Sequence, residues 1–442
     1  MGGFKTTSAP SMNAKLIPII LACLVLGAGT TWWLDRHPIP LSSISSNETA
    51  SQKNPPGYVD GDHLPVPPKP PTSIADMQNQ MAGINSLPPG PQRLETVLAA
   101  FDVWVKTYPK EAMTWAEDKL EGQERLEALQ AGVTAWADVN PAAAAEWVAG
   151  MAEDNSKQQV VFSLMSAWGS KDGPAAAQWL VTNVSNTDTR TSAAETLADA
   201  WAENDPEHAT NWGFDYFTKT NDSNAMQAAL SHWVEQDVQN ARAFVEKLPA
   251  GDTRNVAFTD LAYHWAEKDP NASLSWAGNI PDASLRSQAQ VEAFDSWSQW
   301  EPSKAAAAAS NLDAETQADA DRVIMSAWVN SDAVGASQWL GNLTSGQGKD
   351  NAILEFSSGV IGSDPTSGLN WALQIQDKEV RDSQLQDLGQ QWLNADPAKA
   401  IPWIQQSNLP DSVKRQILQN HGNGTDLSAD GLPTDTPSAP NE

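Results

Sequence analysis

Tryptophan recurs at a nearly constant spacing through most of this chain, and that spacing limits what the chain can fold into. Nine of the twenty Trp residues fall on a ruler of 31 to 33 positions, on which Val360 fills the single vacant mark. A second site follows eleven residues after each mark; it is Trp in eight copies, Phe244 in one and Ala308 in another. A period between 20 and 50 residues is typical of stacked-repeat proteins. The first sites are Trp104, Trp136, Trp168, Trp201, Trp233, Trp265, Trp297, Trp328, Val360 and Trp392.

The residues that come after each first site predict the end of one helix and the start of the next. Counting the first site as position 0, position +4 is Asp and position +5 is Pro in seven copies each. An Asp side chain accepts hydrogen bonds from the free N–H groups of a helix's first turn, and Pro suits the first helical position. Position +8 is always Ala, Ser or Gly. A small residue there lets a neighbouring backbone approach closely, while the aromatic residue at +11 fills the wider gap.

Upstream of position 0 the pattern is also helical. Positions −4 and −7 are apolar in most copies, as in Leu197 and Val161, and this spacing is that of one helix face. Each unit is therefore expected to be two helices of about 12–16 residues, which stack on neighbouring units because one amphipathic pair cannot bury its own face.

Position −11 is basic in eight of ten copies. A cation at a helix start opposes that helix's dipole, so we expect it to bind the free carbonyls at the end of the preceding helix. The alternative is a basic row that binds a ligand. The eight residues are Arg93, Arg125, Lys157, Arg190, Arg254, Arg286, Lys349 and Arg381.

The string from Asp205 to Trp212, Asp-Pro-Glu-His-Ala-Thr-Asn-Trp, resembles the junction between tetratricopeptide repeats. The resemblance covers about 330 residues, but the period is 32 rather than 34, and Tyr216 stands where that family has Gly. It implies an all-α fold, a right-handed α-solenoid of about ten 32-residue helix-hairpin repeats that binds proteins or peptides. It carries over no ligand residue. A more distant family with its own 32-residue consensus fits equally well.

Before the repeats, residues 16–34 form a run of nineteen without a charge, which is long enough to span a bilayer as one helix. Lys5 and Lys15 precede it, and this predicts a cytoplasmic N-terminus with the repeats in the periplasm or outside. A signal peptide cleaved near Ala28, followed by export, is one alternative. Lipid attachment at Cys23 and N-myristoylation at Gly2 are the others.

The chain thus divides into a leader (1–15), a transmembrane signal-anchor (16–34), a Pro/Ser-rich spacer (35–90), ten repeats (91–420) and a disordered tail (421–442). A short helix near Ile74 to Ile84 is expected within the spacer.

The net charge of −28 disfavours binding to nucleic acid and to anionic lipid headgroups. Glu195, Asp199 and Glu203 stand four residues apart, which places like charges on one helix face. This acidity serves solubility or attracts a basic partner. Trp300 lies off the ruler, in a turn, and is a candidate surface contact. These four residues are the candidate partner contacts.

No motif for catalysis stands out. The sequence lacks a zinc-protease His-Glu-x-x-His, a serine-hydrolase elbow, a Walker loop and a dinucleotide glycine fingerprint. His232 and His264 occupy equivalent positions in adjacent repeats, which are about 10 Å apart and so too distant to share a metal. We therefore expect no catalytic residue, no metal and no cofactor. The ruler tryptophans are expected in the core rather than on a sugar-binding surface.

These observations favour a membrane-anchored extracytoplasmic scaffold that binds protein or peptide partners without catalysis. The alternatives are a cell-envelope enzyme and a glycan-binding module, each acting on cell-wall polymer. An enzyme would need a catalytic insertion, and no repeat exceeds 33 residues.

Overall fold

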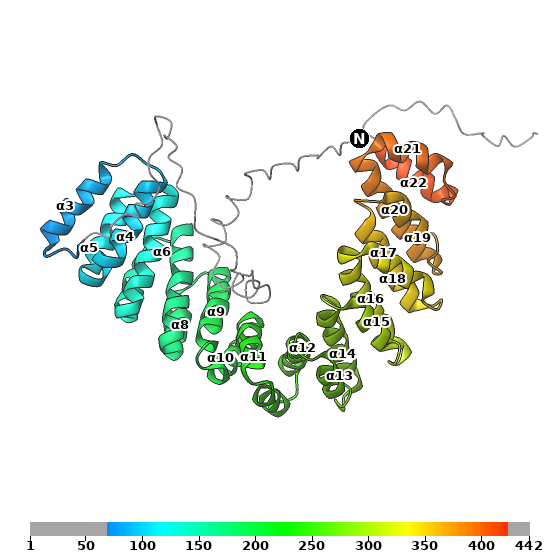
Figure 1. Ribbon diagram of the computed structural model, residues 1–442, viewed down its shortest axis with the longest axis horizontal. Helices are drawn as coiled ribbons and strands as arrows, with labels where there is room; N and C mark the ends of the chain where they lie inside the picture. Colours follow the sequence, from blue (N-terminus) through cyan, green and yellow to red (C-terminus); the bar gives the residue numbers. More distant parts are fainter. Residues whose placement is uncertain (1–68, 423–442) are drawn as a thin grey trace, which may run out of the picture. The chain divides into compact units, whose positions relative to one another are not determined.

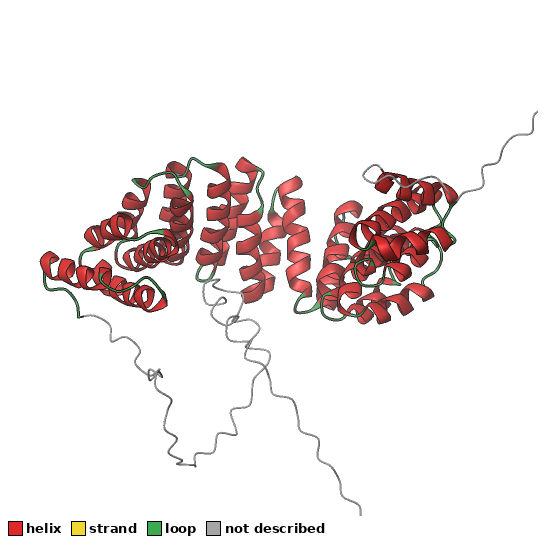
Figure 2. Ribbon diagram, turned by 90° about the horizontal axis from the view of Figure 1, so that it is seen from above, coloured by secondary structure: helices red, strands yellow, loops and turns green. Residues whose placement is uncertain are grey.

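The computed structural model describes residues 69–422, and this part of the chain is all helical, with twenty helices and no strand (Figures 1 and 2). The described residues belong to one unit, residues 65–442. Helix α3 (Ile74–Asn85) precedes the repeats, and α22 (Asp411–Gly422) comes after them.

Each repeat contributes a first helix, which ends just after position 0, and a second helix, which begins at about +5. The first helices are α4 (Pro91–Thr107), α6 (Gly122–Val139), the first part of α8 (Asn155–Asn183), α9 (Thr187–Ala202), the first part of α11 (Asn224–Lys247), α12 (Asp252–Ala266), α14 (Ala283–Ser298), α16 (Ala314–Ser331), α18 (Gln347–Val360) and α20 (Lys378–Ala395).

The second helices are shorter, and three of them have only eight residues, below the predicted 12–16. They are α5 (Pro109–Lys119), α7 (Pro141–Ala149), the second part of α8, α10 (Pro206–Thr220), the second part of α11, α13 (Pro270–Ala277), α15 (Pro302–Ala309), α17 (Ala333–Asn342), α19 (Pro365–Ala372) and α21 (Pro397–Gln406). Each first helix packs against the first helices of the neighbouring repeats and against the second helices beside it. The predicted helical repeat is therefore confirmed.

The Asp at position +4 begins the second helix in the way the sequence predicts. In all seven copies its carboxylate accepts a hydrogen bond from the backbone N–H three residues later; for Asp269, the donor is Ala272 N at 2.9 Å. Asn140 does the same for α7. In α8 and α11 no coil residue separates the two helices. Their Asp172 and Asp237 nevertheless have non-helical φ/ψ angles, −150°/75° and −155°/83°, so the junction is kept.

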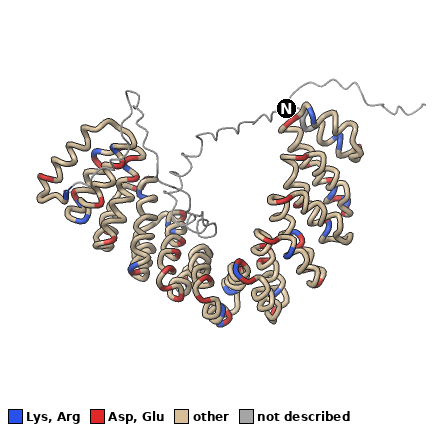
Figure 3. Tube along the Cα trace, viewed as in Figure 1, with Lys and Arg blue, Asp and Glu red and all other residues tan. Residues whose placement is uncertain are grey.

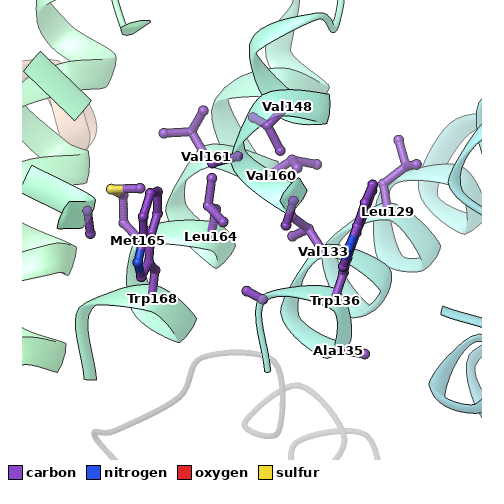
Figure 4. Close-up of a cluster of buried hydrophobic side chains, with 14 of the residues drawn as sticks. Leu129, Val133, Ala135, Trp136, Val148, Val160, Val161, Leu164, Met165 and Trp168 are labelled. Atoms are coloured by element: carbon purple, nitrogen blue, oxygen red, sulfur yellow. The ribbon is translucent and has the colours of Figure 1, made fainter. Parts of the chain in front are cut away.

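The buried core is built largely from the repeated positions that the sequence predicts. Nine of the ten position-0 side chains are buried, and Trp328 is half-buried. In eight repeats the ring at position 0 lies 5.2–6.4 Å, centroid to centroid, from the ring at +11, within the range that aromatic pairs prefer. All ten small residues at +8 are buried. Figure 4 shows this packing around Trp136 and Trp168, with Leu129, Val160 and Leu164 between neighbouring repeats.

The residues at +11 differ from the expectation of a fully buried core. Only Trp276 is buried; the other nine are half-buried, and seven of these are Trp, such as Trp115 and Trp147. The physical reason is that second helices are short and pack mainly on first helices rather than on each other. Rings that point back from them are therefore covered on one side.

The basic residues at −11 tie successive helices together, as predicted, in five of eight copies. Each donates to the carbonyl six residues earlier, just beyond the preceding second helix; Arg286 Nη1 to Ile280 O is 2.8 Å. Arg93 pairs with Glu124 at 2.9 Å instead, and Arg125 lies 3.9 Å from a carboxylate oxygen of Asp154. Arg254 lies over the Phe258 ring. The basic row is thus engaged within the fold.

None of the helices between residues 69 and 422 is long and apolar enough to cross a membrane. The predicted span at residues 16–34, the leader and most of the predicted tail lie outside the described residues. Helix α3 matches the short helix expected near Ile74 to Ile84, and it packs on α4, where Trp104 Nε1 donates to Gln80 Oε1 at 3.0 Å.

Candidate functional site

The acidic stripe predicted on Glu195, Asp199 and Glu203 lies on α9, the first helix of the fourth repeat, and on the residue that caps its end, Glu203. Glu195 and Glu203 are exposed, whereas Asp199 contacts the next repeat: its Oδ1 lies 2.8 Å from His232 Nε2 on α11. The Asp199 carboxylate raises the pKa of His232 above its ordinary value, although partial burial opposes this. Asp199 is therefore partly neutralised inside the molecule whenever His232 is protonated.

Trp300, the fourth predicted contact, is 50% exposed and does not lie with the α9 stripe. It occupies position +3 of the seventh repeat, directly after α14. In four other repeats the residue at +3 reaches back to the carbonyls that end the preceding first helix: Lys171, Asn204, Gln236 and Lys268. Trp300 replaces such a tie with an exposed indole, and the sequence pattern did not reveal these ties.

A stronger concentration of charge lies on α12, in the sixth repeat. Asp260 is 8% exposed; its Oδ1 lies 3.6 Å from His264 Nε2, while its Oδ2 is buried with no hydrogen-bond partner among the described residues. Burial raises the pKa of Asp260, and His264 and Gln227 only partly oppose this. His264 also lies 3.5 Å from Glu267 Oε2. Burial would lower the pKa of His264, but the two carboxylates outweigh it and raise that pKa to about 9. His264 is thus a cation at neutral pH.

The next first helix, α14, adds two carboxylates to this group. Glu292 and Asp295 are half-buried, and burial raises the pKa of each. The negative charges of Asp295 and Asp260 raise the Glu292 pKa further, while Arg322 on α16 lowers the pKa of both residues. Arg322 is not free to serve them alone, because its Nη1 lies 3.6 Å from Glu355 Oε1 on α18.

Tyr263 completes the group from α12. Its ring packs edge-on to the His264 ring, with centroids 5.3 Å apart. Burial raises the pKa of its hydroxyl, and the charges of Asp295, Glu267 and Glu292 raise it further. We call this group the first-helix cluster; it consists of Asp260, Glu267, Glu292, Asp295 and Glu355, with Tyr263, His264 and Arg322.

This arrangement suits the binding of a cation by hydrogen bonds and charge. Carboxyls whose pKa is raised by burial and by like charges are short of positive partners, and such groups concentrate at functional sites. In the described range, no group of three or more His, Cys, Asp or Glu side chains has a geometry that could hold a metal ion.

Two pockets lie beside the second helices. A pocket of about 280 Å³ between α5 and α7 is lined by Trp147, Glu146, Glu117 and Lys110, and partial burial raises the pKa of Glu117. A pocket of about 450 Å³ between α3 and α5 is lined by Trp115 and also by Lys110. The half-buried tryptophans at +11 thus form part of accessible surface.

Sequence reasoning found the α9 stripe and missed the first-helix cluster. The available signal was position −5, which is acidic in Asp260, Glu292 and Glu355 but Ala in the first two repeats. Spacing along the sequence reveals charges that share a face of one helix. The first-helix cluster comes from four repeats, and the burial of its side chains depends on how those repeats pack. Acidic positions occur along the whole described trace, so acidity alone does not mark the place (Figure 3).

Comparisons with protein-family models, with curated proteins and with solved structures found no match for this chain. Its function must therefore be inferred from the helical repeat and the first-helix cluster themselves.

Proposed function

We propose that this chain is a membrane-anchored, extracytoplasmic α-solenoid that serves as a scaffold and binds protein or peptide partners without catalysis of its own. In this proposal the ten repeats stack as a right-handed solenoid, and the partner is basic and lies along the polar face of the first helices. Glu195, Glu203 and the first-helix cluster are the acidic groups of that face.

The repeat supports an extended binding surface. The first helices, from α4 to α20, present equivalent positions in successive repeats, and each packs on the next first helix along the chain, so residues at one position form a row. Position +2 is Glu203, Glu235 and Glu267 in three consecutive repeats. Stacked helical repeats offer such rows for recognition of extended partners.

The observation that carries the proposal is the first-helix cluster. Acidic residues that served only solubility would be exposed. Asp260 is instead buried, and Glu292 and Asp295 are half-buried beside one another. Keeping like charges together and away from water costs stability. A basic partner would offset that cost on binding.

The anchor is the proposed role of residues 16–34, with the N-terminus in the cytoplasm and the repeats in the periplasm or outside. The Pro-rich spacer then holds the repeats away from the membrane. Export after signal cleavage is the alternative, and it leaves the partner-binding proposal unchanged.

A second candidate, glycan binding, is favoured by one observation: Trp115 and Trp147 line pockets beside charged side chains. Aromatic rings with polar neighbours suit sugar stacking. The position-0 tryptophans do not contribute to it, because nine of the ten position-0 side chains are buried.

Partner capture tests the proposal. The full chain, purified in mild detergent, is incubated with solubilised envelope proteins, and bound proteins are identified across a salt series from about 0.05 to 0.5 M, over which surface charges become screened. We expect partners with basic surfaces, which bind more slowly as salt rises. Reversing the charges at Glu195 and Glu203, the two exposed acids of the stripe, should weaken capture further with helicity unchanged. Capture that is indifferent to salt, or retention only by cell-wall polymer, would contradict the basic-partner proposal.

A further inference from the structure

The first-helix cluster is more specific than an acidic surface. We propose that it is a binding site for a single guanidinium group, the side chain of an arginine presented by the partner, between α12 and α14; this inference rests on the proposed function. Glu292, Asp295 and Tyr263 would contact the arginine, and Asp260 would act from beneath them.

The cluster is short of positive charge. It contains five carboxyl groups and two cations, His264 and Arg322. His264 is already shared between Asp260 and Glu267, and Arg322 is shared between Glu355 and the two acids of α14. Asp295 also accepts a hydrogen bond from Gln299 Nε2 at 3.3 Å, but this amide carries no charge, so neither carboxyl of α14 has a cation of its own.

The burial of Asp260 is independent evidence for a bound cation. Its carboxylate is more than nine-tenths buried beside His264, and one of its oxygens lacks any hydrogen-bond partner in the described chain. Leaving such an oxygen unpaired destabilises the folded chain, and more so for a charged group. Fully buried polar atoms without partners are uncommon, and each calls for an explanation. A bound cation above Asp260 supplies one, because it stabilises the buried negative charge.

The shape of the site favours a guanidinium over other cations. Glu292 and Asp295 are three residues apart on one helix, so they lie on the same face and can receive a planar group with donors along two edges. The half-buried Tyr263 ring offers an aromatic surface on the adjacent helix, and arginine stacks on such rings. An ammonium is a compact, strongly hydrated charge that uses neither feature well.

Short peptides test the site directly. The full chain in detergent is titrated with a capped seven-residue Gly/Ser peptide that carries one central arginine, and binding is measured by saturation-transfer NMR of the peptide. Two matched peptides carry citrulline, which keeps the shape without the charge, or lysine. We expect the arginine peptide to bind at least about tenfold more tightly than either, which is about 1.4 kcal/mol. Equal binding of the citrulline peptide would overturn a cation site, and equal binding of the lysine peptide would overturn the guanidinium assignment.

Two variants locate the site. The double change Glu292→Gln with Asp295→Asn should weaken arginine-peptide binding at least about tenfold. The control, Glu207→Gln with Asp215→Asn, removes the same charge from exposed positions on α10 and should change it less than about twofold. We expect the first variant to fold, because neutralising two crowded, half-buried acids removes the repulsion between them. Its resistance to denaturant at neutral pH should equal or exceed that of the parent chain. Equal losses in both variants would refute the location.

The two proposals fail separately. If the arginine peptide binds at the cluster but no envelope protein is captured, the scaffold function is wrong and the site stands. If a basic partner is captured with the same affinity by the Glu292/Asp295 variant, the site is wrong and the scaffold function stands.

Discussion

Asp321 is a buried acid at a position where most copies have an apolar side chain, and replacing it should stabilise the protein at neutral pH. It occupies position −7 of the eighth repeat, where other copies have Leu129, Val161 or Ile353. The side chain lies in α16, 3% exposed, and a Cβ added to Gly348 at the start of α18 would lie 3.0 Å from its Oδ2. Burial alone raises the Asp321 pKa to about 6.

The sign and size of the effect depend on the two protonation states. Because the folded pKa of about 6 exceeds the ordinary value of 3.8, the folded chain holds this proton more tightly than the unfolded chain does. The contribution to stability therefore falls as pH rises from about 4 to 6, and the full cost is present above that. Two pKa units at about 1.4 kcal/mol each give a cost of about 3 kcal/mol at pH 7.5, and about half of that at pH 5.

The test is Asp321→Asn, with Asp319→Asn as the control because Asp319 is exposed on the same helix. Urea unfolding monitored by circular dichroism should show the Asp321 variant more stable than the parent by up to about 3 kcal/mol at pH 7.5, with a smaller gain at pH 5. The sequence pI of about 4.4 makes pH 5 a practical lower limit for solubility. A gain that is absent at pH 7.5, or that grows towards pH 5, would refute the reasoning.

Two further predictions concern packing and the membrane. Gly173→Ala should destabilise the chain by about 1–3 kcal/mol, because the added methyl would overlap the Trp201 indole; Gly341→Ala, where nothing lies within 4 Å, should stabilise α17 by up to about 1 kcal/mol. Thermal and urea unfolding of both variants measure this, and effects of the same sign would contradict the packing. For the anchor, the full chain should resist carbonate extraction from membranes. A mature N-terminus at Gly29, found by sequencing, would instead indicate signal cleavage.

The fold was largely predictable because its determinants are local and repeat. Asp269 accepts the N–H of Ala272 as the Asp at +4 does in all seven copies that have it, and in eight repeats the ring at position 0 meets the ring at +11 across the same helix junction. A copy in which one of these residues differs does not mislead the prediction, because the other copies keep the pattern. Helix α22 was not predicted as a separate element, although the predicted repeats run to residue 420, because it lies beyond the last ruler position. It packs on α20 so closely that a Cβ at Gly389 would overlap Ile417.

The candidate site was only partly predictable, since it depends on distances between repeats. Glu195, Asp199 and Glu203 are recognisable in the sequence from their spacing of four residues, but the contact of Asp199 with His232 requires α9 and α11 to be placed side by side. Burial is a further obstacle. Asp260 reads as one more acid in an acidic chain, and only the packing of α12 against its neighbours shows that its Oδ2 is enclosed.

The division between fold and function can be read from how the ten copies differ from each other. Positions 0, +4 and +8 keep one chemistry in most or all copies because they build the repeat, so they carry no information about a partner. Position −5 is different: Ala99 and Ala131 show that the fold needs nothing polar there, yet Asp260 and Glu292 hold acids at the cost of burying charge. An acidic residue that lowers stability and recurs at the same position in adjacent repeats is expected at a binding site. A partner that spans two repeats must contact matching groups on both of them. The search for the partner should therefore begin at the sixth and seventh repeats rather than along the acidic surface as a whole.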